Sequence, residues 1–214
     1  DEAYLDLSEE HRHEGPTAAS ALAHIALRVE RQVRITVSIG LAPNKFLAKL
    51  ASDLDKPRGF SVIGQREASA KLAVMPVKKI HGVGAVTAER MDALGLKTIA
   101  DLQTRSEAEL TALFGSFGRK LSAYAQGHDE REVTPSRETK SISAEDTFAR
   151  NTASCDDLCA AILPMCTRVA NQLVRKRLSG RTVVVKLKTH DFKLISRHGR
   201  LQFPTQKADL IYDA

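Results

Sequence analysis

A polar stretch with no hydrophobic periodicity, GHDEREVTPSRETK at residues 127–140, divides this chain of 214 residues. Apolar side chains recur at helix or strand spacing before and after it but not within it, a pattern typical of a linker between separately folded parts. The chain is long enough for more than one hydrophobic core, because a domain typically holds about 100–150 residues. We therefore expect several domains rather than one.

The formal net charge of +6 belongs to the C-terminal part of the chain. Residues 1–139 carry 19 basic and 19 acidic side chains, whereas residues 140–214 carry 13 basic and 7 acidic ones. This asymmetry favours a nucleic acid or another anionic partner for the basic part. On charge alone, a merely soluble basic domain stays open as the less favoured alternative.

Membrane and metal chemistry find little support in the sequence. No stretch approaches the roughly 20 apolar residues that span a bilayer, so we expect no membrane contact. Cys155, Cys159 and Cys166 fall in one predicted helix, at a spacing that is unusual for zinc. We interpret them as small buried hydrophobic residues in a reducing compartment such as the cytoplasm.

Residues 1–64 are predicted to alternate strands and helices in the order β-α-β-α-β, as in an α/β layer. The predicted strands are 3–7, 34–40 and a short one after KPRGF, and the predicted helices span 15–33 and 43–54. The opening pair Asp1-Glu2 heads the first strand. Adjacent residues of a regular strand point to opposite faces, so this pair needs a distortion and a further carboxylate to hold a metal.

Residues 65–126 are predicted to be all-helical, in short pieces broken by glycines. Gly82 and Gly84 lie between two helical segments, as in a helix-hairpin-helix, and Lys78 and Lys79 lie beside them. Glycines let the backbone approach a phosphate closely, and the free amides of the next helix point at the anion. The alternative, for this turn and for a weaker copy in LFGSFGRKLSAYAQG, is a pair of ordinary helix caps.

Residues 141–214 are predicted to follow the order β-α-β-β. SISAEDTF is strand-like, a helix over about 154–178 contains Pro164, and two strands meet at a turn near His190-Asp191. The last residues, QKADLIYDA, predict the start of another helix. This order predicts a helix packed on one face of a small antiparallel sheet.

The two predicted strands of this sheet are basic. Because side chains alternate faces, we expect Lys186, Lys188, Lys193 and Arg197 to share one surface. We expect an opposite set, Phe192, Leu194 and Leu187, to meet the helix. Such a basic surface would neutralise several phosphates, although a solvated sheet face with lysines is common. An RNA-recognition sheet would need exposed stacking aromatics, and none is evident on this face.

Four segments resemble motifs of the Y-family of DNA polymerases, the translesion enzymes, and follow one another in the same order as in that family. The resemblance is closest to the bacterial members of the family. DEAYLDL is similar to the end of the family's palm motif, and SIGLAPNKFLAKLASDLDKPRGF (38–60) is the most diagnostic stretch. KKIHGVGAVTAERMDALGL is similar to the thumb hairpin. KSISAEDTF with SGRTVVVKLKTHDF is similar to the little-finger domain, where Ser143 stands in the place of a common glycine. The resemblance covers nearly the whole chain.

The resemblance implies an α+β multidomain fold. It would consist of a partial α/β palm (1–64), an all-helical thumb with helix-hairpin-helix turns (65–126), a linker (127–140) and a β-α-β-β little finger (141–214), which would be incomplete.

The resemblance also implies roles for single residues. Asp1 and Glu2 would be two of three carboxylates that hold a pair of Mg²⁺ ions, Lys56 would face the nucleotide triphosphate, and Gly82 and Gly84 would hold backbone phosphate. Further DNA contacts are expected from the basic side chains Lys78, Lys79, Arg181, Lys186, Lys188, Lys193 and Arg197.

The implied partners are primer-template DNA, deoxynucleoside triphosphates and a sliding clamp, the last through a segment C-terminal to these residues, with the enzyme acting as a monomer. The family begins with a strand that carries its first metal-binding aspartate, followed by the fingers, and these residues do not contain them. We therefore expect this chain alone to bind DNA weakly and not to polymerise. The alternatives are a non-catalytic DNA-binding accessory protein and an RNA-binding module built on residues 140–214.

Overall fold

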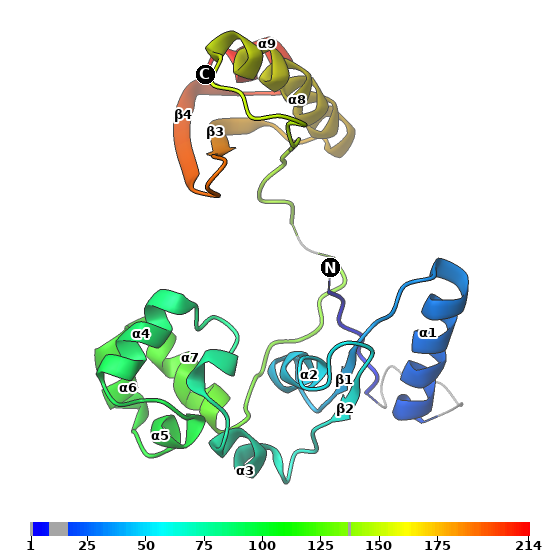
Figure 1. Ribbon diagram of the computed structural model, residues 1–214, viewed down its shortest axis with the longest axis vertical. Coiled ribbons are helices and arrows are strands. Elements are labelled where there is room, and N and C mark those ends of the chain that lie inside the picture. Colours follow the sequence, from blue (N-terminus) through cyan, green and yellow to red (C-terminus); the bar gives the residue numbers. More distant parts are fainter. Residues whose placement is uncertain (1, 9–16, 137) are drawn as a thin grey trace. The chain divides into compact units, whose positions relative to one another are not determined.

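The structure, a computed structural model, describes residues 2–8, 17–136 and 138–214 (Figure 1). The chain forms two compact units, Asp1–Pro135 and Ser136–Ala214, which are described separately below. Within the described residues, no helix is long and apolar enough to cross a membrane.

The first unit opens with a small α/β arrangement of four elements. Helix α1 (Ala18–Val33) and helix α2 (Lys45–Ser52) alternate with strands β1 (Ile39–Leu41) and β2 (Phe60–Val62). The two strands are parallel, and Ile39 pairs with Phe60. Helix α2 lies so close to β1 that a Cβ atom on Gly40 would stand 2.0 Å from the Ala48 carbonyl oxygen. Glycine is therefore required where helix and strand meet.

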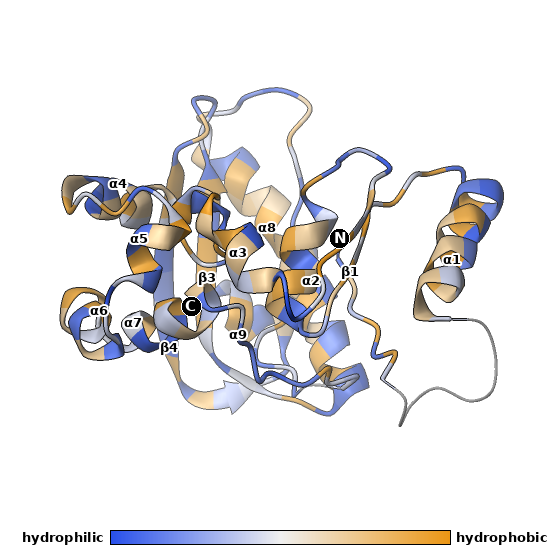
Figure 2. Cartoon of the chain, turned by 90° about the horizontal axis from the view of Figure 1, so that it is seen from below, coloured by the Kyte–Doolittle hydropathy of each residue, from blue (hydrophilic) through white to orange (hydrophobic). Residues whose placement is uncertain are grey.

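Two strand predictions in this region are wrong. Residues 3–7 are not a strand, because none of the described segments provides a pairing partner for their backbone. The strand predicted at 34–40 begins only at Ile39 and continues through Gly40 to Leu41. Arg34 instead ends α1 in a left-handed conformation. Apolar residues interleave with hydrophilic ones along α1 (Figure 2), and only Leu22 of this helix is buried.

The rest of the first unit is a group of short helices, as the periodicity predicted. They are α3 (Ala68–Ala73), the single 3₁₀ turn η2 (Val77–Lys79), α4 (Ala85–Ala93), α5 (Ile99–Gln103), α6 (Glu107–Phe114) and α7 (Ser116–Ala125). Two of them begin with a capping box, Thr98 with Asp101 in α5 and Ser106 with Glu109 in α6. Such reciprocal bonds satisfy backbone amides that a helix start leaves unpaired.

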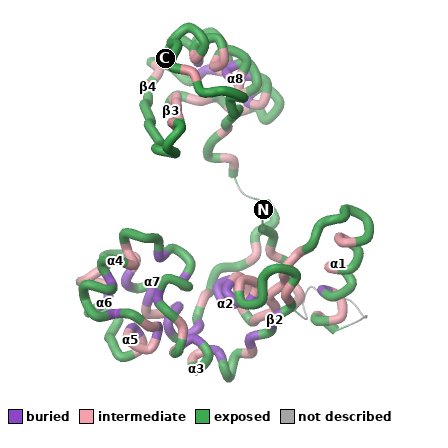
Figure 3. Tube along the Cα trace, viewed as in Figure 1, coloured by how far each residue is buried: buried purple, intermediate pink, exposed green. Residues whose placement is uncertain are grey.

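One hydrophobic core joins α2 to the short helices. Phe46 and Leu47 of α2 belong to the same buried cluster as Leu72, Ile99 and Leu121. Buried segments of the trace occur both at α2 and among the short helices (Figure 3). The Phe46 ring stacks on Tyr124 of α7, with 4.4 Å between the ring centroids. Helix α2, which precedes the loop that carries Lys56, is therefore held by the helical part of the unit.

The second unit packs one long helix on a two-stranded antiparallel sheet. It contains α8 (Cys155–Lys176), β3 (Gly180–Lys188), β4 (Leu194–Thr205) and α9 (Ala208–Tyr212). Its core consists of Cys166, Ala170, Leu173 and Ile211, with Val183 of the sheet packed against them. Helix α8 is continuous through Pro164.

Two expectations for the second unit are corrected. Residues 141–148 are not a strand, although Ile142 does pack against the core. Of the three cysteines, all of them free, Cys166 is buried as expected, whereas Cys155 and Cys159 are exposed.

Candidate active site and DNA-binding surfaces

An alternating row of acidic and basic side chains crosses the exposed side of α2. The carboxylate of Glu2 accepts a hydrogen bond from the Nζ atom of Lys49. Lys49 lies 4.0 Å from Asp53, one helical turn later, and Asp53 lies 2.5 Å from Lys56. Asp1, the other carboxylate predicted here, lies outside the described residues.

Neighbouring charges in this row stabilise one another's ionised forms. The hydrogen bond from Lys49 lowers the pKa of Glu2 below its usual range, and the same bond raises the pKa of Lys49. The hydrogen bond from Lys56 likewise lowers the pKa of Asp53. Glu2, Lys49 and Asp53 are therefore ionised at neutral pH. Glu2 and Lys56, which are 54 positions apart, are thus linked through Lys49 and Asp53.

Sequence reasoning identified Glu2 and Lys56 but missed the two residues between them. The i,i+4 spacing of Lys49 and Asp53 places both on one helix face and was the signal that could have found them. The side chain of Glu2 is 57% exposed and that of Lys56 is 53% exposed. Both therefore remain accessible to a metal or a phosphate.

The loop that carries Lys56 is tightly built. The Ser61 hydroxyl donates a hydrogen bond of 2.5 Å to Asp55, and the Gly59 amide donates to the Ser38 hydroxyl at 3.3 Å. A Cβ atom on Gly59 would lie 2.3 Å from the Asp55 carbonyl oxygen, which explains the glycine of the KPRG sequence. The next basic residue, Arg58, pairs with Glu30 of α1 at 3.0 Å.

Residues 127–132, within the stretch predicted as a linker, dock onto the start of α2. Asp129 accepts a hydrogen bond from the Phe46 amide at 2.9 Å, and Asn44 donates to the Gly127 carbonyl at 2.8 Å. Lys45 donates to the Glu132 carbonyl at 3.2 Å, and its ammonium lies 4.9 Å from the ring of Tyr4. We name residues 127–132 the strap.

The first glycine turn has room for a ligand. Gly82 has a φ of +97°, which favours glycine, and the Phe117 ring would lie 3.2 Å from an added Cβ. Gly84 precedes α4, and among the described residues no atom beyond its own chain neighbours lies within 4 Å of its Cβ position. Lys78 and Lys79 form the end of η2. The element before the turn is one 3₁₀ turn, so the helix-hairpin-helix assignment stays a prediction.

The second glycine pair has a packing role. Gly115 joins α6 to α7 with a φ of +61°. Gly118 is buried inside α7, and its Cβ would lie 2.1 Å from the Leu110 carbonyl oxygen of α6. This close helix contact supports the interpretation of the second pair as ordinary structural glycines.

The register between β3 and β4 places the basic side chains on different faces from those predicted. Lys186 pairs with Ser196 and Lys188 with Leu194, whereas Arg197 pairs with Val185. Directly paired residues point to the same face. The surface away from α8, which we name the outer face, consists of Thr182, Val184, Lys186, Lys188, Leu194, Ser196, His198 and Arg200.

Three predictions about this sheet are therefore wrong. Arg197 does not share the outer face with Lys186 and Lys188, because its partner Val185 lies on the side of α8. Leu194 and Phe192 do not meet the helix, and they are 60% and 80% exposed. The alternation of side chains between the two faces of each strand was predicted correctly. The register that pairs one strand with the other could not be predicted from the sequence.

The remaining predicted basic residues lie near the ends of the hairpin. Arg181 donates to the Leu201 carbonyl at 3.2 Å, next to an irregularity in the ladder. Lys193 pairs with Asp191 at 2.7 Å in the turn. Arg200, which pairs with Thr182 on the outer face, was missed, because its face depends on the same register.

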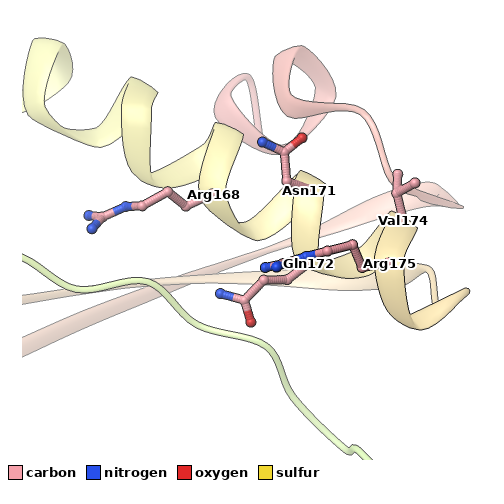
Figure 4. A pocket seen from close by; sticks show the side chains of 5 residues that line it. All are labelled: Arg168, Asn171, Gln172, Val174 and Arg175. Atoms are coloured by element: carbon pink, nitrogen blue, oxygen red, sulfur yellow. The ribbon is translucent and has the colours of Figure 1, made fainter.

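A hollow of about 580 Å³ lies along α8 (Figure 4) and carries no acidic group. It is lined by Arg168, Asn171, Gln172, Val174 and Arg175.

Within the described residues, no three His, Cys, Asp or Glu side chains are grouped so that they could hold a metal ion. The carboxylate of Glu2 is the kind of oxygen ligand that Mg²⁺ prefers. The described part of the chain does not supply the further ligands that a complete metal site needs.

Comparison with known proteins places these features in a family. Two models described as the impB/mucB/samB family match residues 1–53 and, for its C-terminal domain, residues 139–214. A protein named DNA polymerase IV 1 from Mesorhizobium japonicum is 45% identical over 100% of this chain and 49% of its own length. A solved structure, a Y-family DNA polymerase chimera, superposes with a TM-score of 0.66 at 26% identity, over 91% of this chain and 56% of that one.

The chain belongs to the Y-family of DNA polymerases. Further relatives of the Y-family named DNA polymerase IV are similar over 99% of the chain: one from Brucella melitensis is 45% identical and covers 48% of that protein, and one from Caulobacter vibrioides is 43% identical and covers 53%. The resemblance drawn from the motifs is thus confirmed. The chain spans about half the length of the curated relatives that it matches.

Proposed function

We propose that this chain supplies part of a DNA-directed DNA polymerase that copies damaged templates by nucleotidyl transfer. The observation that carries the proposal is the row that joins Glu2 to Lys56, because it brings a predicted metal carboxylate and a predicted triphosphate lysine to one helix. The relatives named DNA polymerase IV support the same activity.

Each residue of the row would have a distinct task. Asp1 and Glu2 would hold Mg²⁺, which when bound as a pair would supply Lewis-acid activation of the primer 3′-hydroxyl and charge stabilisation of the leaving pyrophosphate. Lys56 would neutralise charge that develops on the triphosphate. Its pairing with Asp53 keeps the ammonium beside α2 until a phosphate competes for it. Lys49 balances the negative charge of Glu2.

The DNA would be held by its backbone. The open space at Gly84, with Lys78 and Lys79 close by, suits a phosphate at the start of α4. On the second unit, Lys186, Lys188 and Arg200 of the outer face would neutralise further phosphates. A hold of this kind reads little sequence, which suits an enzyme that accepts damaged templates.

The proposal extends to partners and setting. Primer-template DNA and deoxynucleoside triphosphates would be the ligands, and the enzyme would act as a cytoplasmic monomer that contacts a sliding clamp. The runner-up is a non-catalytic DNA-binding accessory protein, which the exposed basic face supports equally well.

Primer extension by a chimera distinguishes the polymerase function from the accessory DNA-binding role. The chain replaces the matching 214 residues of the Mesorhizobium japonicum relative, and extension of a labelled primer is followed with Mg²⁺ and deoxynucleoside triphosphates. We expect the chimera to extend the primer and the chain alone to bind DNA without extending it. A folded chimera that binds DNA without extension would favour the accessory role.

A further inference from the structure

The tip of the hairpin between β3 and β4 presents an aromatic ring to solvent. Phe192 is 80% exposed, and its φ of +62° is uncommon for a residue with a bulky side chain. Turns usually place Gly, Asn or Asp in this conformation, because these residues adopt it at little cost. The ring is therefore displayed at a position where neither packing nor turn formation requires it.

The turn around Phe192 is well hydrogen-bonded. Its amide donates to the Thr189 carbonyl at 2.9 Å, and the Thr189 amide donates to the Lys193 carbonyl at 2.9 Å. The ion pair between Lys193 and Asp191, at 2.7 Å, is a further contact within the turn. The ring is consequently presented from an ordered base, which lowers the entropy that a ligand must overcome.

The surroundings of the ring are cationic. The Lys188 ammonium lies 5.9 Å from the ring centroid, and residues 186–200 carry five Lys and Arg side chains against one Asp. An anionic ligand with flat aromatic groups meets both requirements. Single-stranded nucleic acid is such a ligand, because each nucleotide joins a base with a π-face to a negatively charged phosphate.

We propose that Phe192 is a stacking platform for an unpaired base of single-stranded DNA, while Lys188 contacts a phosphate of the same strand. Bases inside a duplex are already stacked on one another, so the ring selects an unpaired base. Together with the outer face, the tip would hold the strand where duplex gives way to single-stranded template. This inference rests on the proposed DNA-binding function of the second unit.

A tryptophan at the tip reports stacking directly. The chain contains no Trp, so Phe192→Trp introduces a single tryptophan, whose emission a stacked base quenches and which can be excited selectively beside the tyrosines. The probe is a 12-nucleotide oligothymidylate, compared with an abasic strand of equal length and charge and with a blunt duplex. We expect quenching by oligothymidylate and little change with the other two. Equal quenching by the abasic strand would overturn the proposal.

Affinity gives a second, independent test. Phe192→Ala should weaken the binding of labelled oligothymidylate to the whole chain by about 5- to 150-fold, the usual loss for one stacked base, and leave blunt-duplex binding unchanged. The matched control is Phe203→Ala, because Phe203 is 72% exposed but lies at the far end of β4. Equal effects of the two variants would overturn the stacking role.

The outcomes also separate this inference from the function on which it rests. DNA binding that depends steeply on salt, without quenching and without an effect of Phe192→Ala, would overturn the stacking role alone. Absence of all DNA binding by the folded chain would overturn both. Tighter binding of oligouridylate than of oligothymidylate would reassign the platform to RNA.

Discussion

At the scale of single residues, Asp129 shows how an ionised group can be enclosed. Its side chain is only 2% exposed. Burial raises its pKa, but hydrogen bonds from Arg131 and from the Phe46 amide outweigh this effect and hold the pKa below its usual range. The two bonds from Arg131 measure 2.8 and 2.7 Å. The strap is thus anchored by a buried carboxylate with several partners.

Replacing Asp129 should loosen the strap. Asp129→Asn removes the charge and should lower the free energy of opening at α2 by about 1–3 kcal/mol at pH 7, measured by hydrogen exchange of the Phe46 amide. The control Asp146→Asn changes an ion pair of 4.0 Å between exposed side chains and should cost less than about 0.5 kcal/mol.

The same group predicts a pH dependence. Because the pKa of Asp129 is depressed on folding, its contribution is complete above the unfolded pKa of about 3.9 and is lost as pH falls towards the folded pKa. Protection of the Phe46 amide should therefore fall in acid, and Asp129→Asn should flatten this fall. An unchanged acid profile in the variant would contradict the account.

At the scale of elements, two glycines that look alike in the sequence differ in the structure. Gly118 lies against the Leu110 carbonyl, whereas Gly84 faces open space with a φ of −83°. Gly118→Ala should therefore destabilise the first unit by about 1–3 kcal/mol, as measured by urea denaturation. Gly84→Ala should leave stability within about 0.5 kcal/mol but weaken duplex binding, because its methyl group occupies the proposed phosphate position.

The outer face makes a second prediction at this scale. Changing Lys186, Lys188 and Arg200 together to Gln should reduce the slope of log affinity against log salt by about 2–3, since each phosphate contact contributes about 0.7–0.9. Arg168→Gln with Arg175→Gln, in the hollow of α8, is the control and should leave the slope unchanged. The same loss in both variants would show that only overall charge matters.

Elements also show what the sequence could predict. Helix periodicity located α2, the short helices and α8, because a helix satisfies its own backbone hydrogen bonds. Residues 3–7 and 141–148 carry strand-like patterns but lack a pairing partner among the described segments, which no local pattern reveals. Arg197 was predicted on the wrong face and Arg200 was missed, because a change of register by one residue exchanges the two faces of a strand.

At the scale of the whole molecule, the two units have separate hydrophobic cores. The strap belongs to the first unit, and the boundary between the two units lies between Pro135 and Ser136. Limited proteolysis should cut there before it cuts either core. Both products should keep their hydrogen-exchange protection, and the product that contains β3 and β4 should retain salt-dependent DNA binding. Unfolding of either product would contradict this division.

We propose that Asp1 and Glu2, at the start of the sequence, are metal-binding carboxylates of a polymerase. The most direct measurement is single-turnover primer extension by the chimera with Asp1→Asn, beside Asp6→Asn in the same motif as the matched control. Asp1→Asn should lower the rate by at least about 100-fold at unchanged DNA affinity, whereas Asp6→Asn should not. Equal rates in the Asp1 variant and the parent would contradict it.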